Sequence, residues 1–376
     1  MRAIYAFSGD PITYGHIDIV KRASKTYSEV VVAIGQNPDK TGKYLFSVDE
    51  RLDMARFCLQ QCDNVEVLTF DGLLAEYAYR HGFDVIVRGV RNTSDLEGEL
   101  VFAAVNESLH PTLDTVFFPT RPHLSHISSS VVRALVVEGG DVSDYCPLYV
   151  KEKVEHKVLK RTMIGIAGGI ASGKTWFANE LKSALEKHGL AHYVSLDAVG
   201  HYVLSDSDEA IYKSTRLEIA NTFGVELMNE DGSINRKDLG QIVFSEPVML
   251  NLLNSIMKQP MMARLYEELA FNSKLNGGVV IIEGAILIEA GWTRLVNNNV
   301  ILLDADKETR IDRLTERNQL SEEDATMRIE RQLSAEDRKQ LMEEAIEMDE
   351  WGRLWEYKND GSKIDFDALA KEILDS

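Results

Sequence analysis

A glycine-rich stretch near the middle of the chain has the residue types and spacing of a phosphate-binding loop. Residues 168–175 read Gly-Gly-Ile-Ala-Ser-Gly-Lys-Thr and fit the pattern G-x-x-x-x-G-K-[ST]. An apolar run at 163–167 precedes them and a helical pattern at 176–187 follows, as the motif requires. Backbone N–H groups of such a loop surround phosphate oxygens, while the lysine contacts the β- and γ-phosphates. We therefore predict that ATP is bound by Gly169, Ile170, Ala171, Ser172, Gly173, Lys174 and Thr175, with the Thr175 hydroxyl holding Mg²⁺.

A carboxylate and a group of arginines follow this loop. Asp197 ends a short predicted strand, where it could accept the proton of a hydroxyl nucleophile, or could only cap a helix or join the Mg²⁺ shell. A helix–turn–helix segment with a Ser321/Asp324 cap carries the lid candidates Arg310, Arg313, Arg317, Arg328 and Arg331. Several of these arginines will pair with neighbouring glutamates. We expect Arg313 and Arg317 to contact ATP.

Polar side chains in the first half cluster where predicted strands end. Ser8 and Asp10 lead into Thr-x-Gly-His at residues 13–16, and Lys40 and Arg88-Gly89-Val90-Arg91 follow later strands. Ser128, Ser129 and Ser130 begin a helix whose N-terminus offers N–H donors to an anion. Thr-x-Gly-His alone fits a plain helix start equally well, but four such sets at one sheet edge favour a ligand site.

Strand and helix patterns alternate through both halves. The first half has predicted strands at 2–7, 29–35, 64–70, 84–87 and 115–118, and helices at 17–27, 47–61, 73–81 and 96–109, the second opened by a Ser47/Glu50 capping box. The second half has predicted strands at 163–167, 191–196, 278–282 and 300–303, and helices at 208–223, 236–244, 249–270 with an interruption at Pro260, 307–317 and 366–374. This predicts two α/β domains with parallel sheets, a Rossmann-like domain over 1–158 and a P-loop kinase domain over 159–376, joined by a charged helical connector at 150–161.

Composition limits the possible partners. The chain has 376 residues, which suggests about two domains, and its 44% hydrophobic and 27% charged residues are typical of globular proteins. The net charge is −19 and both halves are acidic, which disfavours nucleic acid as a ligand. Asp10 and Pro11 interrupt any signal peptide, no apolar run reaches membrane length, and three cysteines imply no disulfide framework. We expect a cytoplasmic protein that binds no membrane.

The first half resembles bacterial phosphopantetheine adenylyltransferases. The resemblance covers residues 1 to about 158 and is carried by Asp-Pro-Ile-Thr-x-Gly-His-Ile-Asp-Ile-Val (10–20), Arg-Gly-x-Arg (88–91), Asp-x-Glu-x-Glu (95–99), Asn106 and Ile-Ser-Ser-Ser (127–130). It implies that ATP is contacted by Ser8, His16, Gly89, Arg91, Glu99, Ser128, Ser129 and Ser130. It also implies that 4′-phosphopantetheine is contacted by Ser8, Lys40, Leu73, Leu74, Arg88 and Asn106.

The residue types fit that reaction. An existing phosphate attacks the α-phosphorus of ATP, so positioning and charge stabilisation by His16, Lys40, Arg88 and Mg²⁺ are what catalysis needs. Two departures from the family pattern are notable. Gly-Thr-Phe before Asp-Pro is replaced by Phe-Ser-Gly at residues 7–9, which brings a Cβ to position 7, and Leu124 stands where an aromatic residue is frequent.

The second half resembles dephospho-CoA kinases over residues 163–376. The matching motifs are Gly-Gly-Ile-x-Ser-Gly-Lys (168–174), Asp197 with Gly200-His201, Ile-Asn-Arg-Lys-x-Leu-Gly (234–240), Val-Phe (243–244), Leu-x-Glu-Ala-Gly-Trp (287–292) and Asn-x-Gly (359–361). The resemblance implies Asp197 as the base for the ribose 3′-hydroxyl, Lys174 as a catalytic cation and Asn359 near adenine. Ser195 replaces the first Asp of an Asp-x-Asp pair, and Gln259 replaces a His before Pro.

The two resemblances imply consecutive reactions, because the dephospho-CoA made by the first domain is the acceptor of the second. The expected substrates are therefore ATP, 4′-phosphopantetheine and dephospho-CoA. Two alternatives remain open at this point: a kinase fused to a nucleotidyltransferase of another acceptor, or to a non-catalytic binding module. The resemblance also allows a homo-oligomer formed through the N-terminal domain, an assembly that the fused kinase could block.

Overall fold

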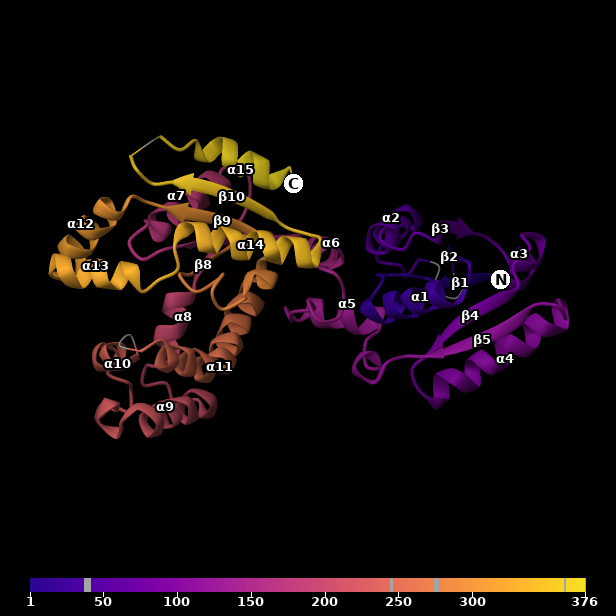
Figure 1. The fold of residues 1–376 in the computed structure, drawn as a ribbon, viewed down its shortest axis with the longest axis horizontal. Coiled ribbons are helices and arrows are strands. Elements are labelled where there is room, and N and C mark those ends of the chain that lie inside the picture. The colour runs from indigo at the N-terminus through magenta and orange to yellow at the C-terminus, as the bar shows by residue number, and fades with distance from the viewer. Residues whose placement is uncertain (37–41, 244–245, 274–276, 362, 376) are drawn as a thin grey trace. The chain divides into compact units, whose positions relative to one another are not determined.

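The computed structural model describes residues 1–36, 42–243, 246–273, 277–361 and 363–375. Contacts within the chain divide it into two compact units, Met1–Val158 and Leu159–Ser376. Each unit is described by itself below, with the elements labelled as in Figure 1.

The first unit is built on a five-stranded parallel sheet. Its strands are β1 (Arg2–Phe7), β2 (Glu29–Gly35), β3 (Val65–Phe70), β4 (Val85–Val90) and β5 (Asp114–Pro119), in the order β3-β2-β1-β4-β5. Its helices are α1 (Tyr14–Thr26), α2 (Val48–Leu59), α3 (Leu74–Arg80), α4 (Thr93–Leu109), α5 (Ser129–Val137) and α6 (Leu148–Leu159), with a 3₁₀ turn η2 (Pro122–Leu124). On one face, Ile4, Val31 and Ile86 of the three central strands pack against α3. The chain crosses from β1 to β2 on one side and later to β4 on the other, so the loops after β1 and β4 lie at the switch point where such sheets bind ligands.

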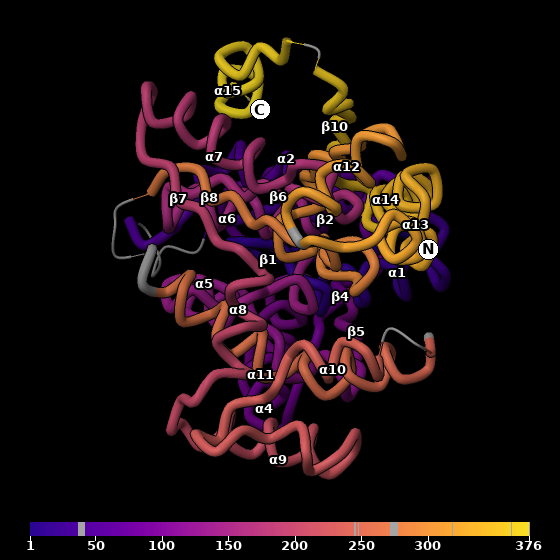
Figure 2. Tube along the Cα trace, turned by 90° about the vertical axis from the view of Figure 1, so that its left-hand side faces the viewer, coloured from indigo at the N-terminus to yellow at the C-terminus, as the bar shows by residue number. Residues whose placement is uncertain are grey.

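The second unit has a parallel sheet with the order β10-β9-β6-β8-β7. Its strands are β6 (Arg161–Gly168), β7 (Ala191–Ser195), β8 (Gly278–Glu283), β9 (Asn299–Asp304) and β10 (Arg353–Lys358). Its helices are α7 (Lys174–Leu185), α8 (Leu196–Val203), α9 (Ala210–Phe223), α10 (Arg236–Val243), α11 (Pro247–Ser273), α12 (Lys307–Asn318), α13 (Glu322–Glu330), α14 (Ala335–Asp349) and α15 (Phe366–Leu374), with 3₁₀ turns η3 (Val225–Leu227) and η4 (Thr293–Val296). Helices α8 to α11 gather on one side of this sheet and α7 and α15 on the other (Figures 1 and 2).

The expected α/β class and the two parallel sheets are confirmed, as are the capping box at Ser47 and Glu50 and the cap of α13 by Ser321. One expectation is wrong. Helix α11 runs through Pro260 without an interruption. A proline inside a helix costs roughly 3 kcal/mol. Pro260 is itself buried, and Met257, Met261 and Leu265 of the same helix belong to the core, so burial of this apolar face offsets that cost.

In the part of the chain that the structure describes, none of the helices has the length and apolarity that crossing a membrane would need.

Candidate active sites

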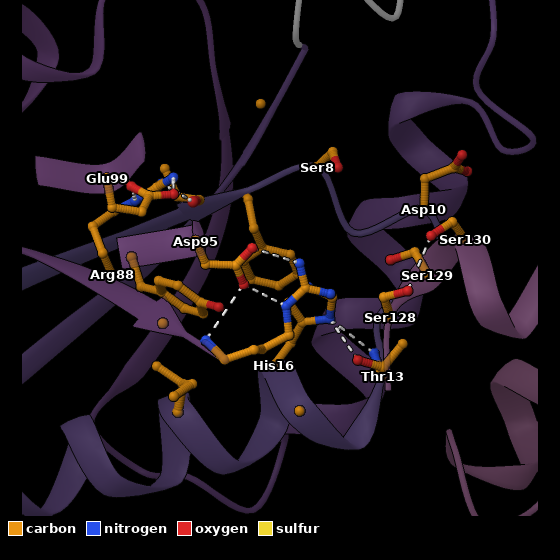
Figure 3. A pocket seen from close by; sticks show the side chains of 18 of the residues that line it. Ser8, Asp10, Thr13, His16, Arg88, Asp95, Glu99, Ser128, Ser129 and Ser130 are labelled. Carbon is orange, nitrogen blue, oxygen red and sulfur yellow. Dashed lines mark hydrogen bonds and ion pairs between the residues drawn. The ribbon is translucent and has the colours of Figure 1, made fainter. Parts of the chain in front are cut away.

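The first unit contains a polar cavity of about 900 Å³ at the carboxyl ends of its strands (Figure 3). The loop after β1, the start of α1, the end of β4, one face of α4 and the start of α5 surround it. Residues expected from the sequence that line this cavity are Ser8, His16, Leu74, Arg88, Gly89, Arg91, Glu99, Ser128, Ser129 and Ser130. Side chains from segments more than a hundred residues apart in sequence are thus brought to one place.

His16 is held in a defined orientation at the start of α1. The Thr13 backbone N–H donates to Nδ1 of His16 at 3.1 Å, and the Thr13 hydroxyl lies 2.9 Å from the same nitrogen. A backbone amide can only donate, so Nδ1 is the acceptor and the ring hydrogen sits on Nε2. The Phe7 ring stacks on the imidazole, with the ring centroids 4.5 Å apart and the planes inclined by 10°. Nε2–H is therefore a fixed neutral donor.

Burial and, to a smaller extent, the positive charge of Arg91 together lower the pKa of His16 to about 4. The imidazole is therefore neutral near pH 7. A neutral Nε2–H can donate a hydrogen bond to a phosphate oxygen without first gaining a proton.

The Phe7 ring occupies the space next to Gly9. Gly9 has a φ of 60°, and a Cβ at this position would lie 3.1 Å from the Phe7 ring. The left-handed backbone and the close ring both require glycine here. The Phe-Ser-Gly order of residues 7–9 is therefore a consistent local arrangement, in which the aromatic ring comes from position 7 and the glycine from position 9.

Two arginines of the cavity are paired with carboxylates on α4. Arg88 donates from Nε and Nη2 to the two Glu99 oxygens, both at 2.5 Å, and Arg91 Nε donates to Asp95 at 2.7 Å. Burial opposes the charge of Arg88, but the hydrogen bond and charge of Glu99 outweigh it and raise the pKa of Arg88. These pairs hold the guanidinium groups in place at the cavity wall (Figure 3).

The three serines at the start of α5 make different contacts. Ser128 caps α5 by accepting the Val131 N–H, and its hydroxyl lies 3.0 Å from that of Ser130. Ser129 donates to the Pro11 carbonyl at 2.8 Å, which ties the start of α5 to the loop after β1. The N-terminus of α5 therefore faces the cavity and can attract an anion.

Some predicted residues are placed elsewhere. Lys40 lies outside the described residues. Leu73 is exposed at the start of α3, and Asn106 lies on α4 beyond the part of that helix that lines the cavity. The stacking of Phe7 on His16 was not predicted from the sequence, since local sequence patterns do not indicate which side chains meet across a loop.

The phosphate-binding loop of the second unit is contacted by several side chains from the rest of the chain. Gln332 accepts the Ile170 N–H at 2.6 Å, Arg313 donates to the Ala171 carbonyl at 3.0 Å, and Asn359 donates to the Ser172 carbonyl at 2.9 Å. Gly173 has a φ of 95°, and a Cβ there would overlap the Asn359 amide. Side-chain donors thus hold the Ala171 and Ser172 carbonyls, while the Ile170 N–H bonds to Gln332 and the Ser172 N–H to the Gly169 carbonyl. A phosphate that uses the Ile170 or Ser172 amide would have to replace these acceptors.

The arginines of the expected lid divide into two groups. Arg310 is buried on α12 and donates from Nε to the Ile170 carbonyl at 2.9 Å, next to the contact of Arg313. Arg317 lies one turn beyond Arg313 and is exposed. The structure therefore brings Arg310 and Arg313 to the loop. Arg310 was a lid candidate, but we expected ATP contacts only from Arg313 and Arg317.

Two carboxylates lie beside the loop lysine. Asp197 is in the first turn of α8, which Ser195 caps by accepting the Ala198 N–H. Glu283 ends β8, is 2% exposed, and accepts a hydrogen bond from the Tyr193 hydroxyl at 2.9 Å. Burial raises the pKa of Glu283; the negative charge of Asp197 raises it further, and the positive charge of Lys174 lowers it. Burial lowers the pKa of Lys174, and the negative charges of Glu283 and Asp197 oppose that shift. Ser195 replaces the first Asp of the Asp-x-Asp pair, and Glu283 is paired with it on the neighbouring strand. Glu283 thus supplies a second carboxylate beside Asp197, which the sequence alone did not predict.

Among the described residues no group of three or more His, Cys, Asp or Glu side chains could hold a metal ion by itself. The oxygens of Thr175, Asp197 and Glu283 are nevertheless the hard donors that Mg²⁺ prefers, and Mg²⁺ at such sites takes most of its ligands from phosphates and water. The residues present fit a cation that enters with its nucleotide.

Comparisons with known proteins agree with this division of the chain. A family model described as dephospho-CoA kinase matches residues 162–351, just over half of the chain, and one described as cytidylyltransferase-like matches residues 8–135. The phosphopantetheine adenylyltransferase of Heliobacterium modesticaldum is 44% identical over 155 residues, covering 41% of this chain and 91% of the relative. That of Caldanaerobacter subterraneus subsp. tengcongensis is 41% identical over 158 residues, covering 42% and 98%.

Among solved structures, a dephospho-CoA kinase from Campylobacter jejuni aligns with 57% of this chain and 96% of its own, at 21% identity and a TM-score of 0.33. Likeness at that level adds nothing to the assignment, which rests on the family models and on the sequence identities. The chain belongs to the dephospho-CoA kinase family through its second unit and to the phosphopantetheine adenylyltransferases through its first, which makes it a transferase of the last two steps of coenzyme A biosynthesis.

Proposed function

We propose that the cavity of the first unit transfers the adenylyl group of ATP to 4′-phosphopantetheine. The observation that carries the proposal is the fixed, neutral Nε2–H of His16 at the wall of a polar cavity. With Ser8, it would donate to the α-phosphate oxygens as charge builds up there in the transition state. The acceptor is already a phosphate, so its oxygen forms the new bond to the α-phosphorus and pyrophosphate leaves without any base.

The other residues of this cavity bind and orient the two substrates. Arg91, Gly89, Glu99 and the three serines at the start of α5 would hold ATP, and Arg88 with Lys40 would hold the phosphate of the acceptor. Leu74 lines the cavity, Leu73 directly precedes it, and Asn106 lies four residues after the cavity-lining Phe102 on α4. These three residues would contact the pantetheine arm. In the structure Nε and Nη2 of Arg88 donate to Glu99 and Nη1 donates to the Ala6 carbonyl, so Arg88 must share these donors with an incoming phosphate.

We infer that the second unit phosphorylates the ribose 3′-hydroxyl of dephospho-CoA. Asp197 would accept the hydroxyl proton, while Lys174 and the loop amides hold the β- and γ-phosphates. Arg313 and Asn359 contact the loop and would bind ATP, Arg313 at its phosphates and Asn359 near adenine. Arg317 is exposed on α12, and a role for it would need the lid to move.

Mg²⁺ is part of the same proposal. When bound, it neutralises charge on the phosphates. The Thr175 hydroxyl would hold it, with Asp197 and Glu283 close enough to orient its water ligands. Because the reaction consumes ATP, we place the protein in the cytoplasm.

We also propose that the first unit forms a homo-oligomer through α4. This 17-residue helix buries none of its residues and exposes Leu100, Val101, Phe102, Val105 and Leu109. An apolar face of this kind is typical of an interface. Sedimentation velocity should find a complex of several chains that Val101→Glu dissociates, while the equally exposed Val225→Glu of the second unit leaves it intact. A monomeric wild type would refute this part.

One assay tests the two reactions. Purified protein is incubated with ATP, Mg²⁺ and 4′-phosphopantetheine while pyrophosphate, dephospho-CoA and coenzyme A are followed by chromatography. All three should appear, with dephospho-CoA formed before coenzyme A. Absence of pyrophosphate, while added dephospho-CoA is still phosphorylated, would exclude the proposed acceptor of the first unit.

A further inference from the structure

A buried arginine stands beside the kinase site. Arg338 lies in the first turn of α14, four residues after the Ser334 cap, and its side chain is 1% exposed. It is one of the largest fully buried side chains of the chain. Burying a charged guanidinium costs several kcal/mol unless its donors are satisfied. A buried arginine therefore needs an account of each of its nitrogens.

Two of these nitrogens have partners and one has none. Nε donates to Glu289 at 2.7 Å, and Nη1 donates to the Leu333 carbonyl at 2.6 Å. Nη2 is buried and has no hydrogen-bond partner among the described residues. A buried donor without a partner costs about 1–3 kcal/mol, and more for a charged group. The Nη2 group of Arg338 is therefore free to donate to a further acceptor.

The surroundings of Arg338 indicate which kind of acceptor that is. Burial lowers the pKa of Lys174, and Arg338 lowers it further; burial also lowers the pKa of Arg310, again with a contribution from Arg338. Gln332, which bonds to the Ile170 N–H, precedes Arg338 on the same segment and is 3.5 Å from Arg310 Nη2. Lys174 and Arg310 bond to carbonyls of the loop, and Arg338 adds a third positive charge that acts on both. Their mutual repulsion is relieved by an anion, and the anion that the loop binds is a phosphate.

We propose that Arg338 is a catalytic residue of the kinase reaction, whose Nη2 donates to an oxygen of the phosphoryl group in transfer. This inference rests on the proposed function of the second unit. In that reaction the bond from the γ-phosphorus to the β,γ-bridging oxygen breaks, the ribose 3′-oxygen forms a bond to the same phosphorus, and the hydroxyl proton moves to Asp197. Arg338 remains protonated throughout. Glu289 fixes its guanidinium before ATP arrives, so little reorganisation is needed as charge develops.

The test compares Arg338→Lys with Arg338→Met in the full chain. Lysine keeps the positive charge beside Glu289 but lacks Nη2, so kcat for phosphorylation of dephospho-CoA should fall roughly 100-fold, with KM for dephospho-CoA within about threefold of wild type. Methionine should lower kcat further. Adenylyl transfer by the first unit, measured in the same samples, should stay unchanged and reports the amount of intact protein.

Arg294→Lys is the matched control. As the Arg338–Glu289 pair does, Arg294 joins α14 to another segment by an ion pair: its Nε and Nη2 donate to Asp349 of α14. Its replacement should leave kcat within about twofold of wild type. Thermal melting of each variant, with and without ATP, separates loss of fold from loss of function, and the lysine variant decides the question if the methionine variant does not fold.

A second measurement distinguishes a catalytic role from a structural one. Guanidinium ion in solution should restore part of kcat to Arg338→Gly and nothing to Asp197→Asn. A lysine variant with wild-type kcat, or a loss that follows only the melting temperature, would show that Arg338 merely joins α14 to Glu289. In either case Asp197→Asn would still abolish phosphorylation if the proposed function holds, so the two failures can be told apart.

Discussion

The two proposed nucleotide sites of this chain are built by different means. In the first unit, side chains from five separate segments surround a cavity of about 900 Å³, and two of its arginines are paired with carboxylates on α4. In the second unit one glycine-rich loop forms the proposed site, and Gln332, Arg313 and Asn359 bond to its backbone. A loop of backbone donors is specified by local sequence, whereas a cavity of side chains depends on the whole fold.

The protonation of the two sites differs in the same way. The first contains a half-buried, neutral histidine, and its proposed acceptor is a phosphate that needs no base. The second contains two neighbouring carboxylates, Asp197 and Glu283, beside a lysine, as expected where a hydroxyl must lose its proton. The difference between the sites therefore follows from the acceptor, a phosphate in one reaction and a hydroxyl in the other.

Removal of the base should separate the sites most strongly. Asp197→Asn keeps the size of the side chain and the start of α8, but it cannot accept the ribose proton. We expect phosphorylation of dephospho-CoA to fall about 10³-fold, within the usual contribution of a general base. Adenylyl transfer, followed as pyrophosphate release, should not change. Equal losses in both reactions would contradict independent sites.

Removal of the histidine should have the reciprocal effect. His16→Ala deletes the Nε2–H donor, and loss of one such donor costs about 10²–10³-fold in rate. Pyrophosphate release should fall by about 100-fold, mainly in kcat, while phosphorylation of added dephospho-CoA stays at the wild-type rate. Ser24→Ala is a suitable control, because Ser24 lies on the same helix outside the cavity lining and its hydroxyl donates to the Lys21 carbonyl of its own helix. A wild-type rate in His16→Ala would remove this residue from the proposed mechanism.

The stacked ring should have a smaller effect. Phe7→Leu removes the aromatic contact that holds the His16 imidazole, and aromatic pairs are worth about 0.5–1.5 kcal/mol. We expect pyrophosphate release to fall roughly two- to tenfold. Phe7→Tyr keeps the ring and should stay within about twofold of wild type. If leucine serves as well as phenylalanine, the stack does not position the histidine.

The same contrast explains what the sequence could predict. The strands and the loop at 168–175 follow from local patterns, because apolar runs and invariant spacings are readable along the chain. Gln332 could not be found in this way, since it bonds to Ile170 from more than a hundred residues away in the sequence. The same holds for Glu283 and Arg338, whose charges act on Lys174 from distant segments. The lid shows the limit within one helix: Arg310, Arg313 and Arg317 share a face by spacing, and only tertiary packing decides that the first two meet the loop.

The charge state of His16 gives the smallest expected effect and the sharpest test of the comparison. Its pKa of about 4 in the folded protein lies below the value near 6.5 of an unfolded chain. Between these values the unfolded chain binds more protons than the folded one, so His16 makes folding less favourable as the pH falls from about 6.5 to about 4. In activity the same shift predicts no change: the ratio of pyrophosphate release by wild type and His16→Gln should be constant from pH 8 to about pH 5.5.

NMR of the protein labelled at histidine Cε1 measures the same quantity directly. The signal that His16→Gln removes should not move above pH 5, because the ring stays neutral there. A midpoint near 6.5 for the His16 signal would mean that the ring is a cation for part of the physiological range. The first site would then stabilise the α-phosphate by charge, as the second does with Lys174, and the proposed difference between a neutral donor and a cationic one would not stand.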